Sequence, residues 1–240
     1  MNDKLSHSFG FQQVAPGERK RRVRHVFEVV APRYDLMNDF MSFGIHRLWK
    51  RTLVSEAAAA PGQVIVDLAG GTGDVARAMA GPDRQVTIID PSPAMMSEGR
   101  RRGLEHVACL AGEGEAIPLA DNSVDTLTVA FGVRNMTDMS AGLKEMARVL
   151  KPGGRCLCLE FSKPWALIRP FYNLYSFLVI PRLGAMVARQ PAAYNYLVES
   201  IRRFPDQEEM KRLMEAAGFR QVRYRNLSMG IAALHIGTKA

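Results

Sequence analysis

Short runs of β-branched and apolar residues alternate with segments of helical periodicity between residues 63 and 161. Most of these runs are followed by a turn and then by a segment whose apolar residues recur at helical spacing. Strands that alternate with helices in this way form a parallel sheet covered on both faces. The predicted strands cover residues 63–68, 85–90, 106–112, 123–131 and 154–161, and one predicted helix covers residues 140–150.

The C-terminal part departs from this alternation. Asp206, with Glu209 three residues later, predicts the start of a helix, and Gly218 predicts its end. Two strand-like runs, residues 221–228 and 232–239, follow without a helix between them. A hairpin is the simplest arrangement for these two runs, and it would add an antiparallel strand to a mostly parallel sheet.

The formal net charge of +8 is compatible with binding to nucleic acid or anionic lipid, or with solubility alone. Part of the excess lies in RKRRVR, residues 19–24, where a solvated helix face is the commonest interpretation. Nucleic-acid grooves place aromatic residues among the basic ones, which this run lacks, so no nucleic-acid partner is predicted. The three cysteines lack metal-site spacing, so we predict neither a metal nor disulfides, and a reduced cytoplasm fits. Neither a signal peptide nor a membrane-spanning helix is indicated.

The segment VDLAGGTGDVA, residues 66–76, joins a predicted strand to a predicted helix. Its glycines allow a sharp turn and a close approach of a ligand to the main chain. Gly71, Gly73 and Ala76 also satisfy the dinucleotide pattern G-x-G-x-x-A, so an NAD dehydrogenase fits this turn as well. Asp90, at the end of the next strand, does not discriminate, because a carboxylate there accepts the ribose hydroxyls of either cofactor.

Asp67, at the end of the first strand, favours S-adenosylmethionine (SAM). A carboxylate there can orient an amino-acid ammonium group, which SAM has and NAD lacks. The run RVLKPGG, residues 148–154, resembles a late motif of Rossmann-like SAM methyltransferases, and that fold usually ends in an antiparallel hairpin. The structural alternatives are a helix-capping role for Asp67 and an ordinary turn at residues 151–154.

Several long motifs in a fixed order point to one family. Together they resemble the ubiquinone/menaquinone C-methyltransferase family, UbiE, from about Phe9 to the C-terminus. The resemblance implies a class I, Rossmann-like α/β fold with a mostly parallel seven-stranded sheet and an antiparallel C-terminal hairpin. It also implies SAM-dependent methylation of a ring carbon of a polyprenyl benzoquinol or demethylmenaquinol. The motifs are YDLMNDFMSFGIHRLW (34–49), VDLAGGTGD (66–74), FGVRN (131–135), RVLKPGG (148–154), LEFSKP (159–164), YSFLVIPRLG (175–184) and YNYLVESIRRFPDQEEM (194–210).

The resemblance assigns SAM contacts to Thr72 in the glycine turn and to Asp90, which is expected on the ribose. The next family contact, usually Asn-Ala, falls on Glu113 and Gly114. A carboxylate oxygen can still accept from the adenine amino group, although the longer side chain of Glu113 changes its reach. The serine common before FG-x-RN is Ala130 here, which leaves only main-chain contact.

Methylation of an aromatic carbon requires loss of a proton from the hydroquinol and alignment of the ring carbon with the methyl group. Arg134 and Asn135 follow the fourth strand and are predicted to stabilise the developing oxyanion, because ligands lie outside the carboxyl ends of such strands. Tyr34 is predicted to orient the substrate or relay a proton, and a positioned base adds roughly 10²–10⁴-fold. The alternative for Arg134 is an ion pair with Asp35 or Asp39 that holds the N-terminal segment over the sheet.

Residues 34–49 mix polar and apolar side chains and are predicted to form a lid that excludes water from the quinol ring. His46 and Trp49 share a helix face, and a packed core histidine is a commoner interpretation of His46 than a catalytic base. Residues 164–188 are apolar and aromatic, but their prolines and arginines argue against a membrane span. They are predicted to admit the isoprenoid tail at a lipid surface, with a buried insertion or a dimer contact as alternatives.

We therefore predict one methyltransferase domain without a metal, located in the cytoplasm or peripherally at the inner face of the membrane. The predicted partners are a prenylated hydroquinone and an anionic membrane surface, with other quinone-biosynthesis proteins and a homodimer also considered. The alternatives are a catalytically silent SAM-binding subunit and a nucleic-acid methyltransferase. The predicted segments are an N-terminal helical lid and substrate segment (1–60), a SAM-binding core (61–162), an apolar insertion (163–204), and a C-terminal helix and hairpin (205–240).

Overall fold

The computed structural model describes residues 8–9, 12–31, 38–39, 42–170, 172, 174 and 191–240. Within these residues, strands and helices alternate from β3 to β7, as the sequence predicts. The elements are β1 (Ser8–Phe9), β2 (Gln12–Gln13), α2 (Pro16–Val30), α4 (His46–Ala57), β3 (Val64–Leu68), α5 (Asp74–Met79), β4 (Gln85–Asp90), α6 (Pro93–Arg101), β5 (Val107–Ala111), β6 (Val124–Ala130), η2 (Val133–Asn135), α7 (Met139–Val149), β7 (Leu150–Phe161), α9 (Pro191–Arg203), α10 (Gln207–Ala216), β8 (Phe219–Leu227) and β9 (Ala232–Lys239).

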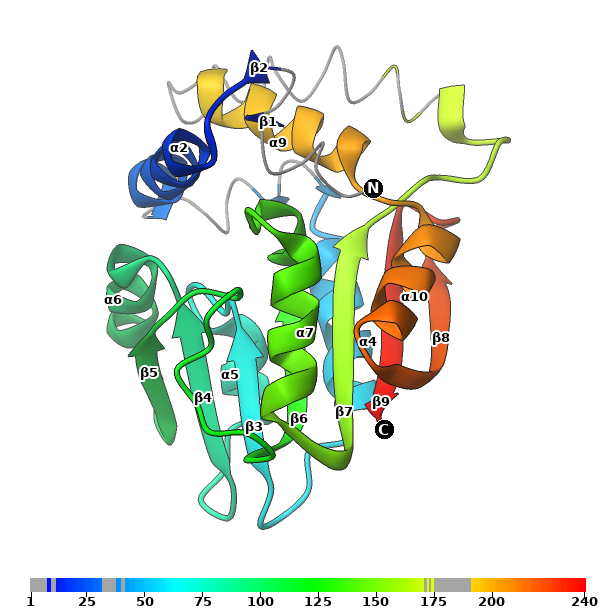
Figure 1. The fold of residues 1–240 in the computed structure, drawn as a ribbon. Coiled ribbons are helices and arrows are strands. Elements are labelled where there is room, and N and C mark those ends of the chain that lie inside the picture. The colour runs from blue at the N-terminus through cyan, green and yellow to red at the C-terminus, as the bar shows by residue number, and fades with distance from the viewer. Residues whose placement is uncertain are drawn as a thin grey trace.

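A seven-stranded sheet with the order β5-β4-β3-β6-β7-β9-β8 forms the centre of the molecule (Figure 1). Neighbouring strands from β5 to β7 are parallel, whereas β9 is antiparallel to both β7 and β8. The predicted parallel sheet and its C-terminal hairpin are therefore confirmed. The strand order reverses between β3 and β6, and in sheets of this kind ligands bind at the carboxyl ends of the strands beside such a point.

Helices cover both faces of the sheet. On one face, α4, α5 and α6 bury side chains such as Leu53, Ala76 and Met96 against the strands. On the other face, α7 and α10 bury side chains such as Leu143 and Met210. Burial on both faces explains why the inner strands are continuous apolar runs.

Two predicted boundaries illustrate what the local sequence determines. Asp206 caps α10, because its side chain accepts a hydrogen bond from the Glu209 N–H at 3.0 Å, as predicted. Strand β7, by contrast, begins at Leu150 rather than at residue 154. Leu150 pairs with Val124 before a register shift, so the turn at Gly153 (φ +78°) is an irregularity within the strand.

Helices α2 and α9 lie over the carboxyl ends of the parallel strands (Figure 1). Arg19 on α2 is only 2% exposed, and its guanidinium donates to the main-chain oxygens of Asn135 at 3.0 Å and Arg134 at 3.2 Å. Tyr196 on α9 stacks on Phe9 with ring centroids 4.5 Å apart. The first contact joins α2 to the loop that follows β6, and the second joins α9 to β1.

Candidate active site

A cleft opens at the carboxyl ends of β3, β4, β5 and β6, beside α2. Within the described part of the chain, Arg134 and Gly73 are not among its lining residues. Tyr34 and Asp35 lie outside the described residues. The remaining predicted site residues line the cleft together, and these are Asp67, Gly71, Thr72, Asp90, Glu113, Gly114 and Asn135.

The glycine turn and Asp90 hold each other in place. Gly71 (φ +56°) donates its N–H to Asp90 Oδ2 at 2.9 Å, and the Ser92 N–H donates to Oδ1 at 2.8 Å. Burial raises the pKa of Asp90 to about 6, while the two N–H hydrogen bonds lower it. Gly73 has φ +82°, and a Cβ there would lie 2.6 Å from Leu104 Cδ2, so this glycine shapes and packs the turn.

Asp67 lies beneath the glycine turn and is 1% exposed. Its carboxylate accepts from Thr128 Oγ1 at 2.8 Å and from the Ala76 N–H at 3.2 Å. The bond from Ala76 satisfies an N–H in the first turn of α5, so Asp67 does cap this helix. Asp67 also lines the cleft, so both interpretations from the sequence apply to it. Burial raises the pKa of Asp67 to about 7, against the Thr128 hydrogen bond and the charge of Lys50, which lower it. A cation beside Asp67 would favour its ionised form.

Glu113 connects the loop after β5 to α2. Its carboxylate oxygens lie 2.6 Å from Lys20 Nζ and 3.5 Å from the Arg24 guanidinium. These two residues of the basic run pair with Glu113 while their side chains stay 49% and 47% exposed, so the expectation of a solvated helix face fails only at the buried Arg19 among the three. Gly114 follows, and a Cβ there would lie 2.4 Å from Met136 Cε, so the main chain packs closely at this end of the cleft.

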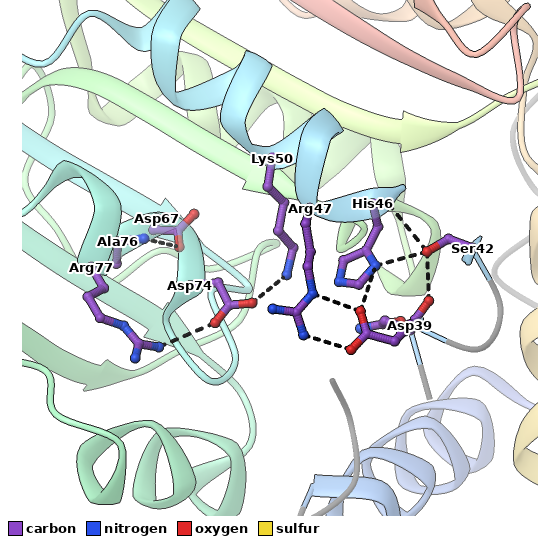
Figure 2. A network of polar contacts seen from close by, with 10 residues as sticks. Asp39, Ser42, His46, Arg47, Lys50, Asp67, Asp74, Ala76 and Arg77 are labelled. Carbon is purple, nitrogen blue, oxygen red and sulfur yellow. Dashed lines mark hydrogen bonds and ion pairs between the residues drawn. The ribbon is translucent and has the colours of Figure 1, made fainter. Parts of the chain in front are cut away.

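Lys50, on α4, also lines the cleft, and Figure 2 shows its side chain directed toward Asp74. Its Nζ donates to Asp74 Oδ2 at 3.0 Å, and its side chain is 15% exposed. Asp74, the first residue of α5, also contacts the Arg77 guanidinium at 3.3 Å. Burial raises the pKa of Asp74, but the charge and hydrogen bond of Lys50 outweigh burial and hold it below its ordinary value.

Arg134 forms a buried ion pair with Glu160, a partner that differs from the sequence-based alternative. Its Nη1 lies 2.6 Å from Glu160 Oε1 and donates to the Phe131 main-chain oxygen at 2.7 Å. Burial raises the pKa of Glu160, and the charge of Arg134 opposes this shift. Asp39 pairs with Arg47 at 2.6 Å instead. The guanidinium of Arg134 is therefore held behind the cleft by Glu160 and the main chain.

Asn135, the next residue, does line the cleft, and its amide is fixed on both sides. Its Oδ1 accepts from the Tyr196 hydroxyl at 3.0 Å, and its Nδ2 donates to the Phe131 main-chain oxygen at 3.3 Å. Burial raises the pKa of Tyr196, so the phenol keeps its proton and remains a donor. Ala130, where a serine was expected, also lines the cleft.

His46 is a core residue that shares the buried face of α4 with Trp49. Its Nδ1 lies 2.9 Å from Ser42 Oγ and 3.7 Å from Asp39 Oδ1 (Figure 2). Ser42 donates its hydroxyl hydrogen to the Asn38 main-chain oxygen at 2.7 Å, so we assign the ring proton to Nδ1. Burial lowers the pKa of His46 to about 4, which makes the ring neutral at pH 7. Among the described residues that line the cleft, His46 is absent, so the structure agrees with a packed core histidine rather than a catalytic base.

Sequence reasoning missed three contributions to the site, namely Lys50, Tyr196 and the cleft-facing side of α2. Val23 and Phe27 are four residues apart and predict an apolar helix face, but their spacing does not say that this face covers the cleft. Lys50 directly follows the motif 34–49, and Tyr196 lies within a later motif. No residue type or spacing marked either of them, because their partners are distant in the sequence.

The strand order, the glycine turn after β3 and the acid at the end of β4 together define a Rossmann-like SAM-dependent methyltransferase fold. A solved structure of a SAM-dependent methyltransferase from Thermotoga maritima is similar to this chain, with a TM-score of 0.63 and 23% sequence identity. The match covers 91% of this chain and 100% of that chain. This likeness shows the fold, and it confirms the predicted fold class.

The chain belongs to the ubiE/COQ5 methyltransferase family, whose model matches residues 15–239. A protein of Rubrivivax gelatinosus named "Ubiquinone/menaquinone biosynthesis C-methyltransferase UbiE" is 62% identical over 236 residues, covering 98% of this chain and 94% of that protein. A protein of the same name from Idiomarina loihiensis is 46% identical over the full length of both chains. The predicted family, the enzyme class and the use of SAM are confirmed.

Replacing Glu113 with glutamine is expected to weaken SAM binding by less than about fivefold, because partly exposed ion pairs contribute about 1 kcal/mol or less. The effect should shrink further at high salt, which screens exposed charges. Titration calorimetry at low and high salt measures both expectations. A loss of about 50-fold or more at both salts would show that Glu113 contributes chiefly through a direct contact with SAM.

Proposed function

We propose that this methyltransferase methylates a ring carbon of a polyprenyl hydroquinone in the synthesis of ubiquinone, menaquinone or both. The observation that carries the proposal is the match of residues 15–239 to one family. Relatives that cover nearly the whole chain and are named for this reaction support it. The cleft supports it too, because acidic groups suited to SAM and the fixed amide of Asn135 line the same cavity.

The charges and the glycine turn of the lining residues suit SAM. Gly71 and Thr72 let a ligand approach the main chain, and Asp90, which lines the same cleft, would accept the ribose hydroxyls. Asp67 would face the ammonium group, while the loop at Glu113 would lie beside the adenine. When bound, SAM supplies an electrophilic methyl group on its sulfonium. The chain's own task is then to orient the acceptor and to manage its proton.

The loop after β6 is suited to hold the acceptor oxygen. A hydroquinol ring carbon becomes nucleophilic when a hydroxyl loses its proton, so the site must bind that oxygen and accept the proton. Asn135 Nδ2 has two hydrogens, of which one bonds Phe131, so the amide retains a donor for the acceptor oxygen. We assign Arg134 a positioning role, because it bonds the same Phe131 oxygen as Asn135. Tyr34 is proposed to orient the quinol or relay the proton.

Methyl transfer from labelled SAM to short-tail demethyl-hydroquinones tests the proposal. Benzoquinol and naphthoquinol acceptors are kept reduced with dithionite, compared with their oxidised forms, and the methyl position is located by mass spectrometry. We expect ring-carbon methylation only of reduced acceptors, and the faster acceptor identifies the preferred pathway. Binding of SAM without product from either quinol would overturn the proposal and favour a catalytically silent SAM-binding subunit.

We also propose that the protein works peripherally at the inner face of the cytoplasmic membrane, because the acceptor carries a long apolar tail. Among the described residues, no helix has the length and apolar character needed to cross a bilayer. After β7, however, Trp165, Leu167 and Leu174 are 55%, 81% and 60% exposed. Exposed apolar side chains on a chain of net charge +8 suit an anionic lipid surface.

The double substitution Trp165→Ser and Leu167→Ser is expected to reduce binding to vesicles containing anionic lipid by at least about fivefold, since each buried CH₂ contributes roughly 0.8 kcal/mol. Flotation with phosphatidylglycerol vesicles measures this binding. Leu110→Ser is the control, because Leu110 is also exposed (38%) and lies in β5, an edge strand separated from β7 by three other strands of the sheet, β4, β3 and β6. Equal flotation of the wild type and the double variant would exclude these side chains as the lipid contact.

A further inference from the structure

The end of the cleft beside β3 holds one carboxylate side chain and one ammonium side chain. Asp67 lines it from the strand end, and Lys50 lines it from α4 (Figure 2). Both side chains line this cleft, and the positive charge of Lys50 lowers the pKa of Asp67, although burial dominates and raises it. An α-amino acid carries both an ammonium and a carboxylate on one carbon. This pair of side chains is therefore complementary to the methionine part of SAM.

Lys50 is held in place but keeps donors for a ligand. Its ammonium has three N–H groups. Within the part of the chain that the structure describes, Asp74 is the one hydrogen-bond acceptor of Nζ, at 3.0 Å. Because the Lys50 side chain is only 15% exposed, a second acceptor reached from the cleft would find it partly desolvated and oriented in advance.

The position of Lys50 also agrees with the order of the other groups along the sheet. Glu113 follows β5, Asp90 ends β4 and Asp67 lies in β3, and these three strands are neighbours in this order. From β5 to β3, the side chains therefore suit adenine, then ribose, then the ammonium group, and Lys50 lies beside the last of them. Beyond the ribose and the sulfonium, SAM carries two charged groups on one carbon, the ammonium that we place at Asp67 and the amino-acid carboxylate.

We propose that Lys50 binds the carboxylate of the methionine part of SAM and that Asp74 holds the Lys50 ammonium in position for it. The inference rests on the proposed placement of SAM in this cleft, with its ammonium at Asp67. It assigns a cofactor-binding role to a helix that otherwise packs in the core through Trp49 and Leu53. The competing role is purely structural, in which the Lys50–Asp74 pair only joins α4 to α5.

Calorimetric binding of three ligands to the full chain separates these roles. S-adenosylhomocysteine has the carboxylate and the ammonium, decarboxylated SAM has only the ammonium, and methylthioadenosine has neither. Lys50→Met is expected to weaken S-adenosylhomocysteine about 10- to 100-fold, as for a charged hydrogen bond, and to change methylthioadenosine by less than about threefold. Decarboxylated SAM, which lacks the group that Lys50 binds, should bind the variant within about threefold of the wild type. Lys50→Arg, which keeps the charge, should restore most of the lost affinity.

Asp74→Asn supplies the matched comparison, because it breaks the same pair and leaves the lysine. If Lys50 binds the carboxylate, Asp74→Asn weakens S-adenosylhomocysteine much less than Lys50→Met does. Equal losses in the two variants, or equal losses for all three ligands, would overturn the inference and leave a structural bridge. Wild-type protein that binds S-adenosylhomocysteine no tighter than methylthioadenosine would overturn it while leaving SAM in the cleft. Failure to bind any of the three would overturn the placement of SAM as well. Melting temperatures establish that each variant is folded.

Discussion

Asp67→Asn is expected to abolish tight SAM binding while making the ligand-free protein more stable at neutral pH. Asp67 is 1% exposed, and because burial disfavours its charged form, its pKa is raised to about 7. Keeping the carboxylate ionised at neutral pH therefore destabilises the folded protein. Asparagine has nearly the same shape and can keep both polar contacts. Its oxygen can accept from Ala76, and its amide can donate to Thr128, whose hydroxyl has the Val66 main-chain oxygen at 3.4 Å as an alternative acceptor.

The sign of the pH dependence follows from the raised pKa of Asp67. The folded protein holds the Asp67 proton more tightly than the unfolded chain, so this group contributes stability that is fully present below about pH 4. That contribution is lost as pH rises toward 7. Wild-type protein should therefore melt at least about 3 °C below Asp67→Asn at pH 8, and the difference should narrow toward pH 4.

SAM binding should show the opposite trend. An ammonium beside Asp67 stabilises the ionised carboxylate, so wild-type affinity for SAM should increase as pH rises from 5 to 8, with proton release on binding below about pH 7. Loss of a buried charged partner costs about 2–5 kcal/mol, or roughly 30-fold or more in affinity. Calorimetry in buffers of different ionisation enthalpy measures both the affinity and the proton release.

Asp125→Asn is the control for these measurements. Asp125 is also an acid on a central strand, paired with Lys151 at 2.8 Å, but it does not line the cleft. This variant should bind SAM like the wild type. If Asp67→Asn also retained wild-type affinity and proton release, Asp67 would be a capping residue for α5 only.

The acids of the cofactor cleft could be predicted because their signals are local. Asp67 and Asp90 each end a β-branched run, and parallel strands bring such ends to one edge of the sheet. The register places Asp67 beside Thr128, which determines its hydrogen bond but has no mark in the local sequence. The sequence thus predicts where an acid lies more readily than what its environment does to its pKa.

The charged pairs around the site depend on contacts between elements, and sequence patterns did not reveal them. Glu113 departs from the family pattern, and nothing in its neighbours indicated that Lys20 of α2 would meet it at 2.6 Å. The same holds for Glu160, which lies in a strand that reads as apolar yet pairs with Arg134. Such pairs arise when helices and loops pack over the sheet, so they depend on the whole fold.

The ion pair of Arg134 and Glu160 allows stability to be separated from catalysis. Arg134→Met is expected to destabilise the protein by about 3–5 kcal/mol, because it leaves a carboxyl group buried without its cation. The double variant Arg134→Met with Glu160→Gln should recover most of that loss, since a neutral buried pair avoids the uncompensated charge. Thermal melting of the single and double variants measures both effects.

Turnover should not recover with stability in the double variant. The guanidinium of Arg134 donates to the Phe131 oxygen that also accepts from Asn135, so its loss loosens the main chain that positions the amide we place against the quinol oxygen. Misplacement of a reacting group by about 1 Å costs roughly 10²-fold, so kcat should stay about 10²-fold below wild type. KM for SAM should change little, because Arg134 does not line the described cleft.

Arg134→Lys provides the second readout, because a lysine keeps the charge for Glu160 but lacks the planar guanidinium whose Nη1 contacts both Glu160 and Phe131. It should be nearly as stable as the wild type and still slow. If kcat instead follows the melting temperature through all three variants, Arg134 contributes to structure alone. A low kcat in two well-folded variants, with unchanged KM for SAM, requires that the guanidinium hold the loop of Asn135 in its reactive position.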